Sequence, residues 1–232
     1  MQLVFDPPAR VTLAVDAEAA RFPVRRIFCI GRNYAEHARE MGNEPTAEAP
    51  FWFMKPADAA FDAGEADAAA IPFPPRTRDL HHEVELTVAL KDGGRDIEPG
   101  RALAHVFGYA ASIDLTRRDL QAEAKRQGRP WDEAKGFDLS APIGPIARTG
   151  PHLDLADGRI ALSVDGEIRQ DGRLGDMISG VPDLIAAISR SVELKAGDLV
   201  MTGTPAGVGP VRPGETLRAS ITGLANCVVR VG

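Results

Sequence analysis

The stretch HHEVELTVAL, residues 81–90, alternates between two kinds of side chain. From Val84 onward the even positions are apolar, whereas Glu83, Glu85 and Thr87 occupy odd positions. Because successive side chains of a strand point to opposite faces, this pattern predicts a strand over 82–90 with both glutamates on one face, about 7 Å apart. A Glu-x-Glu pair alone is typical of a solvated outer face. The alternative is a pair of oxygen ligands for a hard cation.

A third carboxylate, Asp114, follows an apolar strand that is predicted over 106–113. An Asp in this place is often turn chemistry, but Thr116 is available to cap a helix predicted over 116–127, so Asp114 remains spare. Three carboxylates without thiolates favour magnesium or manganese, with coordination positions left open for water and substrate.

Histidines supply the candidate acid–base chemistry. His37 and Glu40 are three residues apart in a helix predicted over 33–41, so they share a face. A carboxylate beside an imidazole orients the ring and raises its pKa, which makes a general base for water; the alternative is an ordinary surface ion pair. His81 and His82 adjoin the glutamate pair, and alternation places only His81 on the ligand face. Ordinary packing accounts for either of these two equally well.

Two further segments carry features of a site. Lys135 lies in the non-periodic stretch EAKGFD, residues 133–138, where a solvated lysine is the simple interpretation. The loop GTPAGVG, residues 203–209, follows a strand but lacks the Lys-Ser/Thr of a nucleotide-binding P-loop. It can still present Thr204 and backbone N–H groups to an anionic substrate.

The rest of the chain reads as strands with a few inserted helices, which favours the α+β class. Strands are predicted at 3–5, 11–15, 24–31, 51–54, 160–164, 167–170, 199–202, 215–222 and 226–231, and helices at 33–41, 116–127 and 181–191. Asn33 and Thr116 are the predicted N-caps, and Asp165-Gly166 predicts a hairpin. Residues 43–80 are mostly irregular, as in segments that frame a site. A boundary near Phe22 divides the chain into a small N-terminal strand segment, 1–22, and a catalytic domain, 23–232.

Composition bounds the class of protein. The 232 residues fit one domain with a small appendage. The net charge of −6 and the aromatic content of 6% argue against nucleic-acid binding. The two cysteines form no CxxC pair, which excludes thiolate zinc sites and favours a reducing compartment. No apolar run approaches 18 residues and no secretory leader opens the chain, so we expect a cytoplasmic protein without a membrane partner.

Several segments, in the same order, resemble the fumarylacetoacetate hydrolase family. They are GRNYAEHAREMG (31–42), FWFMKP (51–56), HHEVELTVAL (81–90), GYAASIDLTRRDLQAEAKRQGRPWDEAKGFD (108–138) and GDLVMTGTPAGVG (197–209). The chain is most similar to the short bacterial fumarylpyruvate hydrolases of that family, and it also resembles the acylpyruvase and oxaloacetate decarboxylase branch. One departure is Met54, where family members often carry a polar residue such as Gln, and it bears on the fine substrate assignment.

The resemblance implies a mixed β-sandwich roll with short helices, usually in a homodimer. It implies Mg²⁺ or Mn²⁺ held by three residues, Glu83, Glu85 and Asp114. It places His37 and Glu40 on a lid-like helix as the pair that activates water, and it gives Lys135 the role of supplying positive charge near developing oxyanions. The substrate-facing positions that it implies are Arg32, Tyr34, Arg118, Gln121 and Thr204.

The implied activity is hydrolysis of a carbon–carbon bond in a 2,4-dioxo acid, with fumarylpyruvate giving fumarate and pyruvate in gentisate-type aromatic degradation. Acylpyruvate hydrolysis, oxaloacetate decarboxylation and isomerisation or hydration of a 2-oxo-alkenoate use the same kind of site and stay open. A non-catalytic protein that holds a cation for stability is a further alternative, although His37 and Glu40 would be surplus to it.

Overall fold

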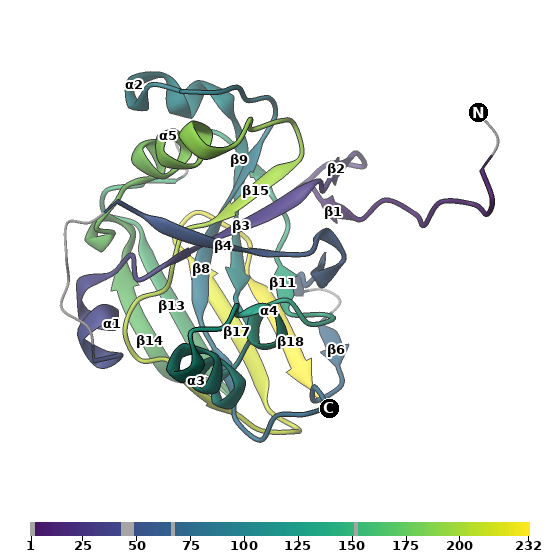
Figure 1. The fold of residues 1–232 in the computed structure, drawn as a ribbon, viewed down its shortest axis with the longest axis vertical. Helices are drawn as coiled ribbons and strands as arrows, with labels where there is room; N and C mark the ends of the chain where they lie inside the picture. Colours follow the sequence, from purple (N-terminus) through teal and green to yellow (C-terminus); the bar gives the residue numbers. More distant parts are fainter. Residues whose placement is uncertain (1–2, 43–48, 66–67, 151–152) are drawn as a thin grey trace.

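Two β-sheets pack against each other in the computed structural model, which describes residues 3–42, 49–65, 68–150 and 153–232 (Figure 1). In spatial order, the larger sheet contains β4 (Phe51–Lys55), β3 (Arg26–Gly31), β15 (Asp198–Met201), β8 (Val84–Leu90), β9 (Val106–Ile113), β11 (Ala141–Ile143) and β5 (Ala60–Asp62), with β12 (Ala147–Arg148) paired to β9. The second contains β14 (Glu167–Arg173), β13 (Arg159–Val164), β17 (Thr216–Ile221), β18 (Cys227–Val231) and β6 (Ala69–Ile71).

Smaller elements complete the described chain. A short sheet joins β10 (Thr116–Arg117), β7 (Leu80–His82) and β16 (Gly209–Val211), and β1 (Thr12–Ala14) pairs with β2 (Arg21–Pro23). The helices are α1 (Ala35–Glu40), α2 (Pro99–Ala102), α3 (Arg118–Gln127), α4 (Asp132–Lys135) and α5 (Val181–Ser191), with 3₁₀ turns at Ala57–Ala59, Leu103–His105 and Leu174–Asp176. The α+β prediction is confirmed. No described helix has the length and apolarity needed to cross a bilayer.

The antiparallel pair β8–β9 forms the centre of the larger sheet. Leu86 and Val88 of β8 share one core with Leu162 and Leu217 of the second sheet, as the apolar positions of the strand predicted. All seven residues of β8 are buried, because packed layers cover both of its faces. The interpretation of the glutamates as a solvated outer face is therefore wrong.

Both strands of this pair, β8 and β9, continue into the short sheet at the same end of the pair. Val84 pairs with Ile113 in one sheet, and His81 pairs with Thr116 in the other. Between these pairs, Glu83, Asp114 and Leu115 belong to no strand, and the Asp114 N–H donates to the Glu83 carbonyl at 2.8 Å. This interruption places two acidic residues side by side at the end of the hairpin.

Tertiary contacts override one predicted helix cap. Asn33 does not cap α1, which has Tyr34 at its N-cap position. The Asn33 side-chain amide donates instead to the carbonyl oxygens of Ser179 at 2.9 Å and Thr202 at 2.8 Å. The residue therefore fixes the segment before α1 to the loop that follows β15.

The second predicted cap is also wrong. Thr116 lies in β10, and its hydroxyl donates to the Asp114 carbonyl at 3.1 Å, so α3 begins only at Arg118. Asp119 accepts a 2.6 Å hydrogen bond from Thr77 as well as one from the Leu120 N–H. By contrast, the Asp165-Gly166 hairpin is confirmed, since both residues have positive φ between β13 and β14.

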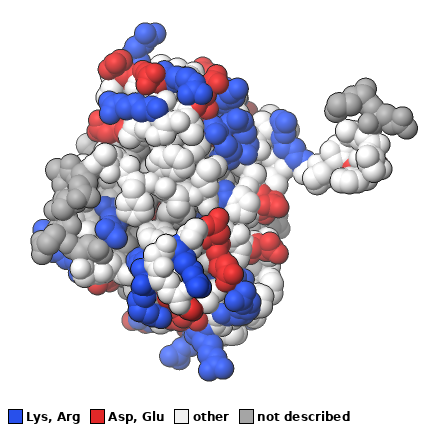
Figure 2. All heavy atoms as spheres, viewed as in Figure 1, with Lys and Arg blue, Asp and Glu red and all other residues white. Residues whose placement is uncertain are grey.

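The N-terminal segment divides into two parts. The hairpin β1–β2 packs into a second core, in which Leu13 and Phe22 contact the layer of Ile27 and Leu199. Residues 3–5 form no strand and extend from the body, so that prediction is wrong (Figure 1). Figure 2 shows this projection as largely uncharged, while acidic and basic side chains are interspersed over the body.

Candidate active site

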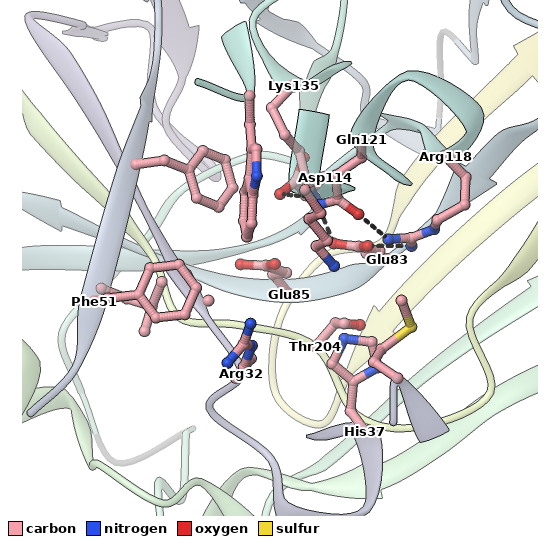
Figure 3. A pocket seen from close by; sticks show the side chains of 16 residues that line it. Arg32, His37, Phe51, Glu83, Glu85, Asp114, Arg118, Gln121, Lys135 and Thr204 are labelled. Atoms are coloured by element: carbon pink, nitrogen blue, oxygen red, sulfur yellow. Dashed lines mark hydrogen bonds and ion pairs between the residues drawn. The ribbon is translucent and has the colours of Figure 1, made fainter. Parts of the chain in front are cut away.

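Three carboxylates converge at the end of the β8–β9 hairpin. Glu83 lies between β7 and β8, Glu85 lies on β8, and Asp114 directly follows β9. One oxygen from each carboxylate lies within 4.8 Å of the other two, and all three side chains are buried. Figure 3 shows the three residues together beside a cavity.

Two lysines and an arginine neutralise two of these carboxylates. The Lys135 ammonium donates hydrogen bonds of 2.7 Å both to Glu83 Oε2 and to Asp114 Oδ2. The ammonium of Lys55 lies 2.9 Å from Asp114 Oδ1, and the guanidinium of Arg118 donates to Glu83 Oε1. Lys135 is 2% exposed, so the interpretation of a solvated lysine is wrong.

Glu85 differs from the other two carboxylates. It accepts a 2.7 Å hydrogen bond from the Gly203 N–H, but no cation of the described residues forms an ion pair with it. Burial raises the pKa of Glu85 well above its ordinary value, and the charges of Asp114 and Glu83 add to the rise. Burial acts in the same direction on Glu83, but Lys135 and Arg118 outweigh it and hold the pKa of Glu83 well below the ordinary value.

The donor set fits a divalent cation of the magnesium or manganese kind. Such ions take carboxylate oxygens in octahedral geometry with bonds of about 2.1 Å, so ligand oxygens lie roughly 3–4 Å apart. The observed spread of up to 4.8 Å needs only a small inward movement. An ion here would also give Glu85 the positive partner that the described side chains do not supply.

His37 lines the same cavity from α1, on the side of Thr204 (Figure 3). Its Nδ1 lies 3.2 Å from Glu40 Oε2, and Glu40 accepts hydrogen bonds from the Gly207 N–H at 3.1 and 3.3 Å. Burial lowers the pKa of His37 below 6.5 and outweighs the carboxylates of Glu83 and Glu40, which raise it. The shift favours the neutral ring, in which an Nδ1–H held by Glu40 leaves Nε2 as the proton acceptor.

Two histidines, His81 and His82, adjoin the three carboxylates Glu83, Glu85 and Asp114, which we call the triad. His81 Nδ1 accepts a hydrogen bond of 3.4 Å from Arg118, which in turn donates a 2.6 Å bond to Gln121. Alternation favoured His81 for the ligand face, but neither it nor His82 lines the cavity. The contact between His81 and the triad is indirect, because the guanidinium of Arg118 donates to both His81 and Glu83.

Thr204 is fixed by a buried amide behind it. Gln170 Nε2 donates to Thr204 Oγ1 at 2.8 Å, and Gln170 Oε1 accepts from the Val84 N–H at 3.0 Å. The same oxygen lies 2.9 Å from Nδ1 of His82. This network connects the loop 203–209 to the strand that carries the glutamates.

Aromatic rings form the wall of the cavity opposite His37. Phe51 and Phe53 come from β4, and both contact Trp131, with centroid distances of 5.7 and 5.6 Å. The Phe51 ring lies over Gly31, where an added Cβ would meet ring atoms at 2.0–2.7 Å. A glycine is thus required for this wall to close over the end of β3.

The structure brings most of the predicted site residues to one cavity. Its lining includes Arg32, His37, Glu83, Glu85, Asp114, Arg118, Gln121, Lys135 and Thr204. Glu40 lies behind His37, and Tyr34 lines a neighbouring hollow instead. Sequence reasoning missed Lys55. Its spacing was a usable signal, because Phe51, Phe53 and Lys55 are two residues apart along β4 and so share one face.

Comparisons with known proteins identify the family of the chain. The family model for the fumarylacetoacetate (FAA) hydrolase C-terminal region matches residues 26–232. The chain belongs to the fumarylacetoacetate hydrolase family.

Its relatives have different activities. A crystal structure of fumarylpyruvate hydrolase from Pseudomonas aeruginosa in complex with Mn²⁺ and pyruvate has 45% sequence identity and a TM-score of 0.96, with 99% of each chain covered. Mitochondrial oxaloacetate decarboxylase of Dictyostelium discoideum is 44% identical over 86% of this chain and 90% of the relative. Mitochondrial oxaloacetate tautomerase of Homo sapiens is 39% identical over 89% of this chain and 91% of the relative.

Proposed function

We propose that the protein is a divalent-metal-dependent hydrolase that cleaves fumarylpyruvate, a 2,4-dioxo acid, to fumarate and pyruvate. The observation that carries the proposal is the arrangement of the His37–Glu40 pair along the same cavity as the carboxylates bridged by Lys135. The Pseudomonas aeruginosa relative, crystallised with Mn²⁺ and pyruvate, supports it.

The ion would be held by Glu83, Glu85 and Asp114. When bound, Mg²⁺ or Mn²⁺ supplies Lewis-acid stabilisation of negative charge that develops on the 2-oxo group of the substrate. The other tasks belong to side chains. Arg118, Gln121 and Thr204 line the cavity with donors that orient the first carboxylate of the substrate.

His37 accepts a proton from water while the water oxygen attacks C4 of the substrate, and Glu40 stabilises the resulting imidazolium. Lys135 has three N–H donors, two of which bind Glu83 and Asp114, so one is available to the tetrahedral oxyanion. Collapse of this intermediate breaks the C3–C4 bond. Fumarate leaves with the water oxygen, and the pyruvate enolate receives a proton at C3.

A substrate panel tests this proposal. Mn²⁺-loaded protein is assayed with fumarylpyruvate, acetylpyruvate and oxaloacetate, and the three are ranked by kcat/KM. We expect fumarylpyruvate to rank first, with equal amounts of fumarate and pyruvate formed. A higher rank for acetylpyruvate would reassign the protein as an acylpyruvate hydrolase. Conversion of fumarylpyruvate without release of pyruvate would indicate an isomerase or hydratase.

Oxaloacetate decarboxylation or tautomerisation is the second candidate, because the relatives from Dictyostelium and Homo sapiens carry these activities. Neither reaction needs an attacking water. His37→Ala therefore separates the two functions: a hydrolase loses about 10²–10⁴-fold in rate, whereas decarboxylation of oxaloacetate persists. His105→Ala is the control, since His105 contacts Asp92 and does not line the cavity.

We propose in addition that the protein is a homodimer. The segment 3–5 supports this, because Val4 and Phe5 are 99% and 77% exposed on an arm that extends from the body (Figure 1). Such apolar exposure is typical of contact surfaces. Sedimentation of the full chain and of a variant lacking residues 1–10 tests it: a monomeric full chain overturns the proposal.

Two further assignments are proposals of the same kind. The buried free thiols of Cys29 and Cys227 support a reducing compartment, which we propose to be the cytoplasm. A role in aromatic catabolism follows from the proposed substrate, fumarylpyruvate. Residues 1–22 would be an accessory segment beside the catalytic domain 23–232. Expression of residues 23–232 tests that division, and loss of folding would overturn it.

A further inference from the structure

Lys125 is a cavity-lining residue without a role in the proposed reaction. It lies on α3, four residues after Gln121 and seven after Arg118, so one helix face carries all three toward the same cavity. Its ammonium lies 5.1 Å from the ring centroid of Trp131. With a rise of 1.5 Å per residue, the backbone of Lys125 lies about 10 Å along the helix axis from that of Arg118.

Arg32 lines the same cavity and lies against the same aromatic wall. Its guanidinium carbon lies 5.5 Å from the centroid of Phe51, which contacts Trp131 edge to face. Arg32 has φ +57°, in the left-handed region, and its neighbour Asn33 is anchored by side-chain hydrogen bonds. The backbone therefore holds this cation at the cavity despite local strain.

These two cations differ from the others that line the cavity. Lys135 and Arg118 form ion pairs with the carboxylates, whereas the side chains of Lys125 and Arg32 form no ion pair or hydrogen bond among the described residues. Burial, together with the positive charges of Arg118, Arg32 and Lys135, lowers the pKa of Lys125 to about 8 against the opposing effect of Glu83. An ammonium that has no acidic partner among the described residues favours an anion as its partner.

We propose that Lys125, together with Arg32 on the same aromatic wall, binds the second carboxylate of a dicarboxylic 2-oxo acid and so selects such substrates over 2-oxo acids with an uncharged end. This inference rests on the proposed function, because it places the first carboxylate and the 2-oxo group at the end of the cavity that Arg118, Gln121, Thr204 and the metal-binding carboxylates form. Lys125 leaves α3 about two helical turns beyond Arg118, so a substrate that reaches both needs a chain of several carbons between its two carboxylates.

Two unreactive acids of equal chain length test the proposal. 2-Oxopimelate and 2-oxoheptanoate have seven carbons each, and only the first has a terminal carboxylate. Their dissociation constants are measured by calorimetry with the Mn²⁺-loaded protein. We expect 2-oxopimelate to bind about tenfold more tightly, as for one charge-assisted hydrogen bond. Equal affinities would overturn the proposal.

Variants identify the residue responsible. Lys125→Met should remove most of the preference while leaving the affinity for 2-oxoheptanoate unchanged, and Lys125→Arg should retain it. Arg126→Met is the control, since Arg126 is the next cation on α3 but does not line the cavity. A preference that survives in Lys125→Met overturns the assignment. If 2-oxopimelate binding depends on Lys125 but fumarylpyruvate is not cleaved, the proposed function fails and this inference stands.

Discussion

The ammonium of Lys135 donates a 2.7 Å hydrogen bond to Glu83, 52 residues away in the chain, and both side chains are buried. The same ammonium binds Asp114 at 2.7 Å. One cation thus connects two of the three carboxylates, while Glu85 lies beside them without a cationic partner in the part of the chain that the structure describes. The electrostatics of the site follow from this unequal division of charge.

Removal of the Lys135 charge should destabilise the metal-free protein. Lys135→Met leaves two buried carboxylates short of a partner, and losses of roughly 3–5 kcal/mol are typical of such changes. Addition of Mn²⁺ should restore more stability to the variant than to the wild type, because the ion supplies the missing charge. Urea unfolding with and without Mn²⁺ measures both effects.

Lys195→Met is the matched control, since Lys195 forms an exposed pair with Glu193 and should change stability by less than about 1 kcal/mol. If metal-free Lys135→Met were as stable as metal-free Lys195→Met, the bridging role of the Lys135 ammonium would be wrong.

The acid limb of the pH–rate profile should lie below pH 6.5. The pKa of His37 is lowered by burial, and the neutral ring is the active form, so kcat/KM falls only as the pH drops through this lowered value. Glu40 raises the pKa of His37, and Glu40→Gln should therefore move the limb to lower pH while it reduces kcat. Glu36→Gln, an exposed change on the same helix, should leave the limb in place. A limb above 6.5 in the wild type would contradict the assignment of His37.

Gly31→Ala should damage the aromatic wall. The new Cβ would overlap the ring of Phe51, which must move away from Trp131. We expect a rise in KM for fumarylpyruvate and a loss of about 1–3 kcal/mol of stability, as for other overpacked sites. Gly100→Ala is the control, because an added Cβ has open space there. Unchanged KM and stability in Gly31→Ala would show that the wall tolerates the displacement.

The sequence predicted what local patterns determine. Alternation in residues 81–90 identified the strand and the common face of Glu83 and Glu85, and the hairpin at Asp165-Gly166 followed from turn chemistry. Asp114 was found because it stands directly after an apolar strand. The resemblance to a family added the roles of His37 and Lys135, which spacing alone left open.

The features that sequence reasoning missed depend on contacts between distant segments. Asn33 has the residue type of a helix cap, but Ser179 and Thr202 offer its amide better partners. Lys55 stands at the end of an apolar strand, and only the folded chain places it against Asp114. Lys125 has the pattern of a solvated helical lysine, and its position at the cavity depends on where Trp131 packs.

The most direct test of the account measures fumarate and pyruvate formed from fumarylpyruvate by one protein preparation with Mn²⁺, after chelation, and after Mn²⁺ is returned. We predict that chelation abolishes the formation of both products, that Mn²⁺ restores it, and that Glu85→Gln stays inactive in all three conditions. Cleavage that continues at the original rate in the chelated protein would contradict the assignment of Glu83, Glu85 and Asp114 as the metal site of a hydrolase.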